Sequence, residues 1–322
     1  MIINRKQINR KKGFNKRIKT LLGLFVFVFF LVWIIPPATA ADSNFTVASQ
    51  ALLRKYQAIQ LNLDSNNLHA PLFMESTIKR NTAKGDVYAL LNYPYDQVVA
   101  TLQVAQNWCG IAILHVNIKS CVAGTDGDES SQLSFYVGTK EYQTPAEAFK
   151  LRYDYRLKAL SDDYLDVSLT AGQGPLGTQD YLIELEGVPI DRHTTFIHFK
   201  YSYGFGFVAK LAMDTYLATL GRNKVGFTIK GRDNSGLPVY VAGIKGVIER
   251  NSMRYFLAIK AYLDALKLPR EQRFEARLNE WFDYTQKFKR QLFELEKNDY
   301  LAAKRKEGTN QLALQTADDR GD

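Results

Sequence analysis

Eleven residues of strict alternation constrain this chain more than any other feature of its sequence. From Phe149 to Ala159 every odd position is apolar or aromatic and every even position is charged. Successive side chains of a strand point to opposite faces, so this pattern predicts a strand with one face on a core and the other in water. We expect Tyr153 and Tyr155 to face the interior, and Arg152 and Arg156 to face solvent. A sheet with one wet face is typical of antiparallel pairing.

The stretches before and after this strand predict a run of further strands. Extended apolar runs, separated by Gly, Pro, Asp and Asn, predict strands at 72–80, 86–91, 115–122, 132–137, 164–171, 181–188 and 194–203. No long helix separates the strands that follow residue 132, which excludes a doubly wound parallel sheet.

Helices are predicted on both sides of this run. Apolar residues at helical spacing predict helices at 42–63, 95–108, 207–220 and 270–306. The longest well-patterned helix is Ile244–Leu266, which has a wide apolar seam and an opposite face that is mostly charged. One side of such a helix must be buried against a large surface, and the preceding strands supply it. We therefore expect this helix across the concave face of the sheet, with Asn251 and Tyr255 lining a cavity beneath it.

The first 40 residues predict an export signal. A basic stretch without acids precedes the apolar run Leu21–Ile35, and Ala38-Thr39-Ala40 offers a small-x-small cleavage site. We expect an exported, periplasmic protein, with an uncleaved N-terminal anchor as the alternative. The chain carries a net charge of +9, and residues 1–40 hold eight Lys and Arg, which leaves +1 for residues 41–322. A chain so close to neutral lacks the basic footprint of a nucleic-acid-binding protein, so no nucleic-acid partner is expected.

Two cysteines, Cys109 and Cys121, lie in the exported part of the chain. In an oxidising compartment we expect them to form a disulfide that closes a short loop, worth on the order of 3 kcal/mol. The alternative is a free thiol or a metal-binding pair, although this spacing without a matching cluster of histidines is poor for zinc.

The sequence shows no metal, cofactor or catalytic motif. Its histidines are scattered, at positions 69, 115, 193 and 198, and none forms a pair at zinc spacing. Gly204–Ala209 fits the dinucleotide pattern G-x-G-x-x-G/A, but no acid stands at 222–231, where the ribose ligand is required. We interpret it as a glycine turn from a strand into a helix, and we expect neither a cofactor nor a metal.

The order of these elements resembles the START-like helix-grip fold, also called the SRPBCC superfamily. Gly85–Leu91, Asn107–Cys121 and Glu249–Tyr255 are similar to segments of a branch of exported bacterial proteins in that superfamily. The resemblance covers about Leu72 to Leu268. It implies an α+β fold in which a curved antiparallel sheet wraps around a long C-terminal helix, here with extra N- and C-terminal helices. It also implies a cavity for a hydrophobic ligand, as in lipid-transfer and polyketide-cyclase relatives.

The resemblance also suggests how the chain is divided. We expect a signal peptide at 1–40, an N-terminal helical segment at 41–70, the helix-grip domain at 71–268, a C-terminal helical extension at 269–307 and a disordered tail at 308–322. The helices outside the helix-grip domain have no counterpart in the minimal fold.

Six side chains are candidates for contact with a ligand, because they are aromatic or polar and fall on faces that should be buried. They are Tyr153, Tyr155, Tyr201, Tyr203, Asn251 and Tyr255. A buried amide costs on the order of 1–3 kcal/mol unless it is paired, so Asn251 and the hydroxyls could orient a polar head in an apolar cavity. The alternative is that they bond to one another or to the backbone and complete a core.

Three functions follow from these observations. The first is a periplasmic binding or carrier protein for a hydrophobic, lipid-like small molecule held between the sheet and the closing helix. The second is an enzyme of cyclase or lyase type that uses the same cavity, and we favour a protein without catalytic activity over it. The third is an envelope structural or interaction protein, whose partner would bind residues 270–306 through Trp281, Phe282 and Phe288.

Overall fold

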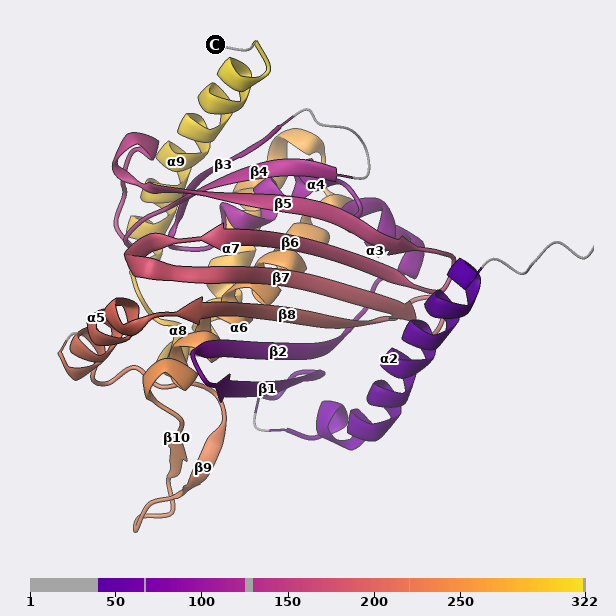
Figure 1. Cartoon of the computed structure of the whole chain (residues 1–322), viewed down its shortest axis with the longest axis horizontal. Helices are drawn as coiled ribbons and strands as arrows, with labels where there is room; N and C mark the ends of the chain where they lie inside the picture. Colours follow the sequence, from indigo (N-terminus) through magenta and orange to yellow (C-terminus); the bar gives the residue numbers. More distant parts are fainter. Residues whose placement is uncertain (1–39, 67, 125–129, 220, 321–322) are drawn as a thin grey trace, which may run out of the picture. The chain divides into compact units, whose positions relative to one another are not determined.

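The computed structural model describes residues 40–66, 68–124, 130–219 and 221–320, so the predicted signal peptide lies outside the described residues. Phe45–Asp322 form one compact unit. Within the described residues an eight-stranded antiparallel sheet runs in the order β1-β2-β8-β7-β6-β5-β4-β3 (Figure 1). The strands are β1 (Leu72–Lys79), β2 (Thr82–Leu91), β3 (Ile118–Ala123), β4 (Ser130–Val137), β5 (Phe149–Leu160), β6 (Leu165–Gln173), β7 (Thr178–Pro189) and β8 (Thr195–Phe205), and a separate hairpin pairs β9 (Ile229–Arg232) with β10 (Pro238–Tyr240).

Helices precede, interrupt and follow the sheet. They are α2 (Ala40–Asp64), α3 (Tyr95–Leu102), α4 (Ala105–Ala112), α5 (Phe207–Ala218), α6 (Gly243–Asp264), α7 (Arg270–Gln286), α8 (Lys289–Leu292) and α9 (Lys297–Asp318), with short 3-10 turns η1 (Pro145–Glu147), η2 (Pro175–Gly177) and η3 (Ala265–Lys267). This is the predicted α+β helix-grip architecture. Within the described residues, no helix is both long enough and apolar enough to span a bilayer.

The alternation in β5 sets the two faces of the sheet as predicted. Tyr153 and Tyr155 are each 1% exposed, whereas Arg152 and Arg156 are exposed on the other face. The register of β5 with β6 continues the pattern, because Tyr155 lies opposite Leu169 and Arg156 opposite Ser168. The prediction of facing is therefore confirmed.

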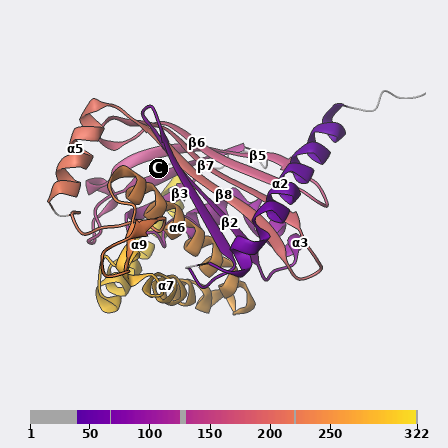
Figure 2. The same ribbon diagram turned by 90° about the horizontal axis from the view of Figure 1, so that it is seen from below.

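Helix α6 packs across the concave face of the sheet against β1, β2 and β8 (Figure 2). Most of its residues are buried, because the sheet covers one side and α4 and α7 contact it elsewhere. The helix comes so close to β2 that a Cβ atom on Gly85 would lie 2.4 Å from the Oγ of Ser252. Glycine at this position therefore permits the close approach. The predicted place of the closing helix is confirmed.

The convex face is partly covered by α2 and holds a network of charges. Leu52, Ile59 and Leu63 of α2 form a second apolar cluster with residues of β2, β7 and β8. Beside this cluster, His198 is held between two carboxylates, with its Nε2 2.9 Å from Asp86 and its Nδ1 2.8 Å from Glu186. The network ties β2, β7 and β8 together on the face opposite α6.

The predicted disulfide is present and joins α4 to β3. Cys109 and Cys121 are bonded, with their Cα atoms 5.0 Å apart. Both cysteines are about 1% exposed, so the bond lies in the core. It fixes the end of the helical excursion to the last strand of the sheet.

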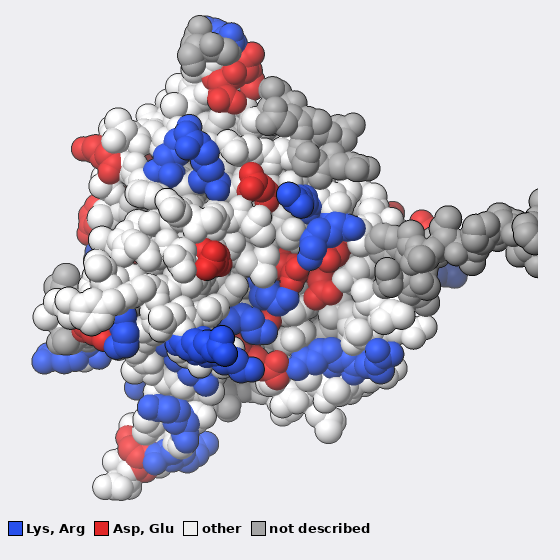
Figure 3. All heavy atoms as spheres, viewed as in Figure 1, with Lys and Arg blue, Asp and Glu red and all other residues white. Residues whose placement is uncertain are grey.

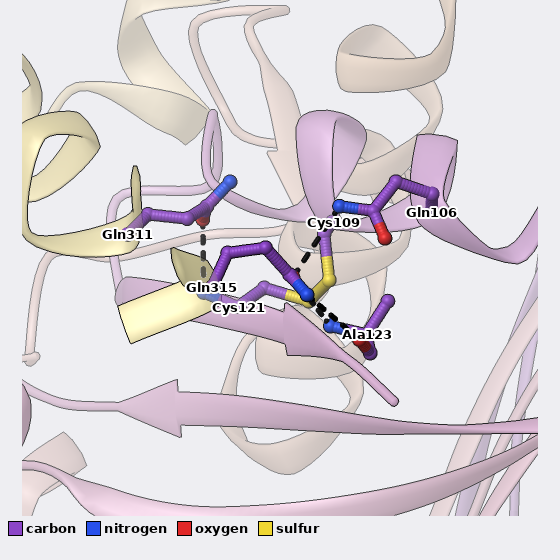
Figure 4. Close-up of a disulfide and its surroundings, with 6 residues drawn as sticks. All are labelled: Gln106, Cys109, Cys121, Ala123, Gln311 and Gln315. Atoms are coloured by element: carbon purple, nitrogen blue, oxygen red, sulfur yellow. Dashed lines mark hydrogen bonds between the residues drawn. A yellow bond between two sulfur atoms is a disulfide. The ribbon is translucent and has the colours of Figure 1, made fainter. Parts of the chain in front are cut away.

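Side chains of α9 pair with the open edge of β3 (Figure 4). The N–H of Cys121 donates to the Oε1 of Gln311 at 2.8 Å, and the N–H of Ala123 donates to the Oε1 of Gln315 at 3.0 Å. Gln315 also donates from Nε2 to the carbonyl of Ala123 at 2.9 Å. An unpaired strand edge is prone to aggregation, and these glutamines supply the partners that a ninth strand would otherwise provide.

A buried ionic cluster holds the same helix in place. Lys119 of β3 and Lys304 and Glu307 of α9 are each at most 1% exposed, and both ammonium groups lie within 2.9 Å of the Glu307 carboxylate. The prediction of a disordered tail from residue 308 is therefore wrong for residues 308–318. Of these residues, Gln311 and Gln315 bond the edge of β3.

Two predicted helices are interrupted, for the same physical reason. Between α3 and α4, the carbonyl of Thr101 accepts from Asn107 Nδ2 at 2.7 Å, and that of Leu102 accepts from Trp108 Nε1 at 2.9 Å. Between α8 and α9, the carbonyl of Phe293 accepts from Lys224 Nζ at 2.7 Å. Side chains thus bind carbonyls that a continuous helix would use.

Candidate ligand-binding site

Five tyrosines from three strands and one helix meet on the concave face beneath α6. We call Tyr153, Tyr181, Tyr201, Tyr203 and Tyr255 the tyrosine cluster. Ring centroids of Tyr201 lie 5.8 Å from Tyr203 and 5.3 Å from Tyr255, and those of Tyr181 lie 6.3 Å from Tyr153 and 5.6 Å from Tyr203. On each strand the tyrosines occupy positions whose side chains point to the concave face, and Tyr255 lies on the side of α6 that faces the sheet.

The hydroxyls of the cluster are almost all without a protein partner. Tyr181 shares a hydrogen bond of 2.7 Å with the Oγ1 of Thr178. In the part of the chain that the structure describes, no such bond is made by the hydroxyls of Tyr153, Tyr201, Tyr203 and Tyr255. These residues are buried, with exposed fractions between 1% and 7%. None of these four oxygens is among the fully buried polar atoms that lack a partner, so the hydroxyls remain open to a partner other than the protein.

Burial keeps these hydroxyls neutral. It raises the pKa of Tyr153 and Tyr201 well above the usual value of 10.0, and it also raises the pKa of Tyr203 and Tyr255. The neighbouring tyrosines add to the shift in Tyr153 and Tyr201. The cluster therefore presents protonated hydroxyls, which can donate to a ligand, throughout the physiological pH range.

His115 and Asn251 extend the polar lining beside Tyr255. The imidazole of His115 is 3% exposed and stacks on the Tyr255 ring with centroids 4.6 Å apart. Its Nδ1 accepts from the N–H of Asn117 at 3.1 Å, and its Nε2 makes no hydrogen bond of good geometry within the described residues. Asn251 lies close enough to act on the ring, while its Oδ1 accepts from Arg254 at 3.3 Å.

These contacts assign the protonation state of His115. Burial lowers its pKa well below 6.5, the positive charges of Arg254, Lys304 and Lys119 lower it further, and Asn251 opposes them weakly. The ring is therefore neutral at physiological pH. Because Nδ1 accepts from a backbone amide, the proton belongs on Nε2, which makes that atom a donor.

Five of the six predicted ligand-binding residues lie in or beside the tyrosine cluster, and Tyr155 does not. Tyr155 is buried on the same face, but its hydroxyl donates to the carbonyl of Gln103 at 2.5 Å, so it stabilises the end of α3. Sequence reasoning missed Tyr181 and His115. The inward parity of Tyr181, Ile183 and Leu185 in β7 could have identified the first, whereas nothing in the sequence singles out His115.

The cavity predicted beneath α6 stays a prediction. A cavity elsewhere, lined by Val116, Trp281, Leu292 and Tyr300 among others, has a volume of about 10 Å³, which is room for a single water molecule. That volume excludes a lipid-like ligand there. No group of three or more His, Cys, Asp or Glu that could hold a metal ion occurs among residues 40–320 as far as the structure describes them.

No protein-family model and no curated protein matches the chain. Among solved structures, it is similar to the Zhui aromatase/cyclase from Streptomyces sp. R1128, with 12% identity and a TM-score of 0.28 over 68% of this chain and 96% of that one. It is also similar to human StAR-related lipid transfer protein 5, with 9% identity and a TM-score of 0.29 over 55% of this chain and 90% of that one. A third is norcoclaurine synthase from Thalictrum flavum, with 13% identity and a TM-score of 0.30 over 45% of this chain and 91% of that one.

All three TM-scores lie below 0.5 and all three identities below 25%. These likenesses therefore carry no argument, and the side chains of the chain itself carry the case for its function.

Proposed function

We propose that this protein binds a hydrophobic small molecule between its sheet and α6 and carries it without catalysing a reaction. The observation that supports this is a set of four buried tyrosines whose hydroxyls make no hydrogen bond within the described residues. The surrounding surface is apolar, because Phe135, Phe199 and Phe205 lie among the cluster. A mostly apolar interior with a few convergent polar groups is what small-molecule sites have in common.

His115 fits an anchoring role better than a catalytic one. To act as a general base, Nε2 would have to accept a proton, and a neutral ring could do so only by moving its own proton to Nδ1. That change breaks the hydrogen bond from the amide of Asn117. The geometry thus favours an Nε2–H that donates to the ligand, and it weakens the case for a cyclase or lyase.

An envelope structural role through residues 270–306 would need the aromatic side chains of this segment to be exposed, and they are not. Trp281 is 3% exposed and Phe282 is 7% exposed, and Phe288 is packed against the same core. The indole N–H of Trp281 donates to the carbonyl of Arg254 at 3.0 Å. Trp281 thus bonds α7 to α6, Phe282 packs on Tyr300 of α9 and Phe288 on Phe227, so these aromatics do not offer an apolar stripe to a partner.

The compartment belongs to the same proposal. The basic and apolar pattern of residues 1–40 supports export, and we propose the periplasm as the place of action. The Cys109–Cys121 disulfide agrees with this, because disulfides persist in oxidising compartments.

Native mass spectrometry of the protein purified from its own envelope tests the binding proposal. We expect an added mass from a hydrophobic molecule that is lost on denaturation, and retention should fall in the double variant Tyr201→Phe/Tyr255→Phe. The matched control is Tyr155→Phe, which removes a hydroxyl of the same face that already has a protein partner. Equal retention by both variants, or no bound molecule together with no uptake of long-chain alcohols, would contradict the proposal.

A further inference from the structure

A segment of unusual composition stands between the last strand of the sheet and the closing helix. Residues 206–242 contain α5 and the β9–β10 hairpin, and both project at the same end of the sheet (Figures 1 and 2). This is the end at which β8 finishes and at which η2 connects β6 to β7. α5 contacts η2, so the two form one surface there.

The start of α5 exposes three apolar side chains. Phe207 is 80% exposed, Val208 66% and Leu211 57%, and their spacing puts them on one face of the helix. Leu176 of the adjoining η2 is 68% exposed. Ala209, on the other side of α5, is 6% exposed and packs into the core. We call Leu176, Phe207, Val208 and Leu211 the α5 patch. Contiguous exposed apolar side chains of this size mark an interaction surface.

Basic residues gather beside the α5 patch. Residues 206–242 contain five Lys and Arg and two Asp, a net charge of +3, whereas residues 41–322 as a whole carry +1. Lys210 and Lys224 are paired with acids, and Arg222, Lys230 and Arg232 are exposed. Figure 3 shows Lys and Arg gathered over the β9–β10 hairpin, next to the largely uncharged surface of α5. The hairpin also exposes Leu237 at 59%.

We propose that the α5 patch and the β9–β10 hairpin dock this protein on an anionic phospholipid bilayer. Apolar side chains that enter the headgroup region, with basic residues around them, are the combination that binds such a surface. Charge decides against a second copy of the chain. A two-fold dimer through this surface would bring together two copies of a segment whose net charge is +3.

The docking surface lies at the end of β8, the strand that carries Tyr201 and Tyr203 of the tyrosine cluster. Tyr203 and Phe205 of β8 have ring centroids 6.4 Å apart, and Phe207 follows two residues later at the start of α5. A bilayer at this surface would lie next to the strand end that leads to Tyr201 and Tyr203 of the tyrosine cluster. The inference rests on the exposed surface and its charge, and it stands whether or not the interior binds a ligand.

Amide hydrogen exchange of the full protein, with and without vesicles, locates the contact. With vesicles of phosphatidylglycerol and phosphatidylcholine in equal parts, exchange should slow in 206–242 and in η2, and the effect should weaken at high salt. With pure phosphatidylcholine the protection should be much smaller. Unchanged exchange in 206–242 with anionic vesicles overturns the proposal, even if the protein binds them elsewhere.

Co-sedimentation of matched variants measures the contribution of each part. Phe207→Ser/Leu211→Ser should reduce binding at least tenfold, whereas Leu61→Ser and Leu312→Ser, at positions 84% and 72% exposed, should leave it unchanged.

Lys230→Gln/Arg232→Gln should also reduce binding by roughly tenfold or more, since each basic side chain near an anionic surface contributes about fivefold. Arg152→Gln/Arg156→Gln, which removes the same charge from the convex face, should have little effect. Equal losses in test and control variants overturn the proposal. So does a fall in oligomeric state of Phe207→Ser/Leu211→Ser in the absence of lipid, because that result assigns the patch to self-association.

Discussion

Replacing single tyrosines with phenylalanine separates hydroxyls that serve the fold from hydroxyls kept for a ligand. Tyr155 and Tyr300 are the controls, because their hydroxyls donate to the carbonyls of Gln103 at 2.5 Å and of Leu114 at 2.9 Å. Each replacement removes the donor of a carbonyl that is buried at Leu114 and partly buried at Gln103, and the free energy of unfolding should fall by about 1–3 kcal/mol. Tyr201→Phe breaks no hydrogen bond within the described residues. Its free energy of unfolding should therefore stay within about 0.5 kcal/mol of the parent or rise slightly.

Urea unfolding of protein stripped of bound lipid, followed by near-ultraviolet circular dichroism, measures these differences. For a chain of this size, about 1 kcal/mol corresponds to a shift of about 2–4 °C in Tm, so calorimetry should rank the variants in the same order. The stripped state matters because a ligand bonded to Tyr201 would make Tyr201→Phe costly by mass action. A loss in stripped Tyr201→Phe as large as in Tyr155→Phe would refute the reasoning, since it would show that the hydroxyl has a structural partner.

Three further changes test other parts of the structure. Asn251→Leu should lower ligand retention in native mass spectrometry with little change in stability, and destabilisation by several kcal/mol would assign the amide to the core. Burial works against charge on His198, but its hydrogen bonds to two carboxylates outweigh this and raise its pKa above 6.5. The stability it contributes is therefore complete below pH 6.5 and is lost as pH rises through the folded pKa, so His198→Gln should flatten that loss in Tm scans. Burial lowers the pKa of Lys304 to about 7, with Glu307 opposing and Lys119 adding to the shift. The folded state therefore binds fewer protons than the unfolded state above pH 7, and stability should rise from there toward pH 10.5, a rise that Lys304→Met should abolish.

The parts of the fold that follow from local pattern were predictable. Alternation gave the facing of β5 because a shift of one residue would bury Arg152 and Arg156 and expose Tyr153 and Tyr155, and no packing compensates for that. The same parity placed Tyr201 and Tyr203 on the concave face. The apolar seam of α6 required a large partner, and the sheet is the only one that the order of elements supplies.

The parts that depend on contacts distant in sequence were not predictable. In the sequence, Gln311 and Gln315 look like residues of a solvated tail. Their role depends on β3 being the edge strand of the sheet, because the free backbone N–H groups of Cys121 and Ala123 then need acceptors. Lys304 is polar in a helix of mixed composition, and its burial depends on the carbonyls of His115 and Ile118, at 2.8 Å and 2.7 Å. Helix and strand propensities give no information about hydrogen-bond partners that are more than 180 residues away in the chain.

Polar groups on the convex face of the sheet are charged and paired, whereas those on the concave face are neutral donors. This difference predicts the chemistry of the ligand. On the convex face, charge is paired with charge, as His198 is with its two carboxylates. On the concave face, burial keeps the hydroxyls of Tyr201 and Tyr255 protonated, and the Nε2 of His115 carries a proton. Such donors are satisfied by a ligand that ends in an acceptor, and they stay unpaired beside a pure hydrocarbon.

We therefore expect an apolar molecule with a carbonyl or hydroxyl end to bind more tightly than the hydrocarbon of equal length. Each hydrogen bond to the acceptor should add about 0.5–1.5 kcal/mol, which is about twofold to tenfold in affinity. Titration calorimetry of a long-chain methyl ketone against the matching alkane, with the parent and with Tyr201→Phe/Tyr255→Phe, measures this preference. The preference should shrink in the double variant, because the donors that produce it are gone. Equal affinity for ketone and alkane in the parent would contradict this, because it would show that the hydroxyls take no part in binding and that the apolar walls alone determine affinity.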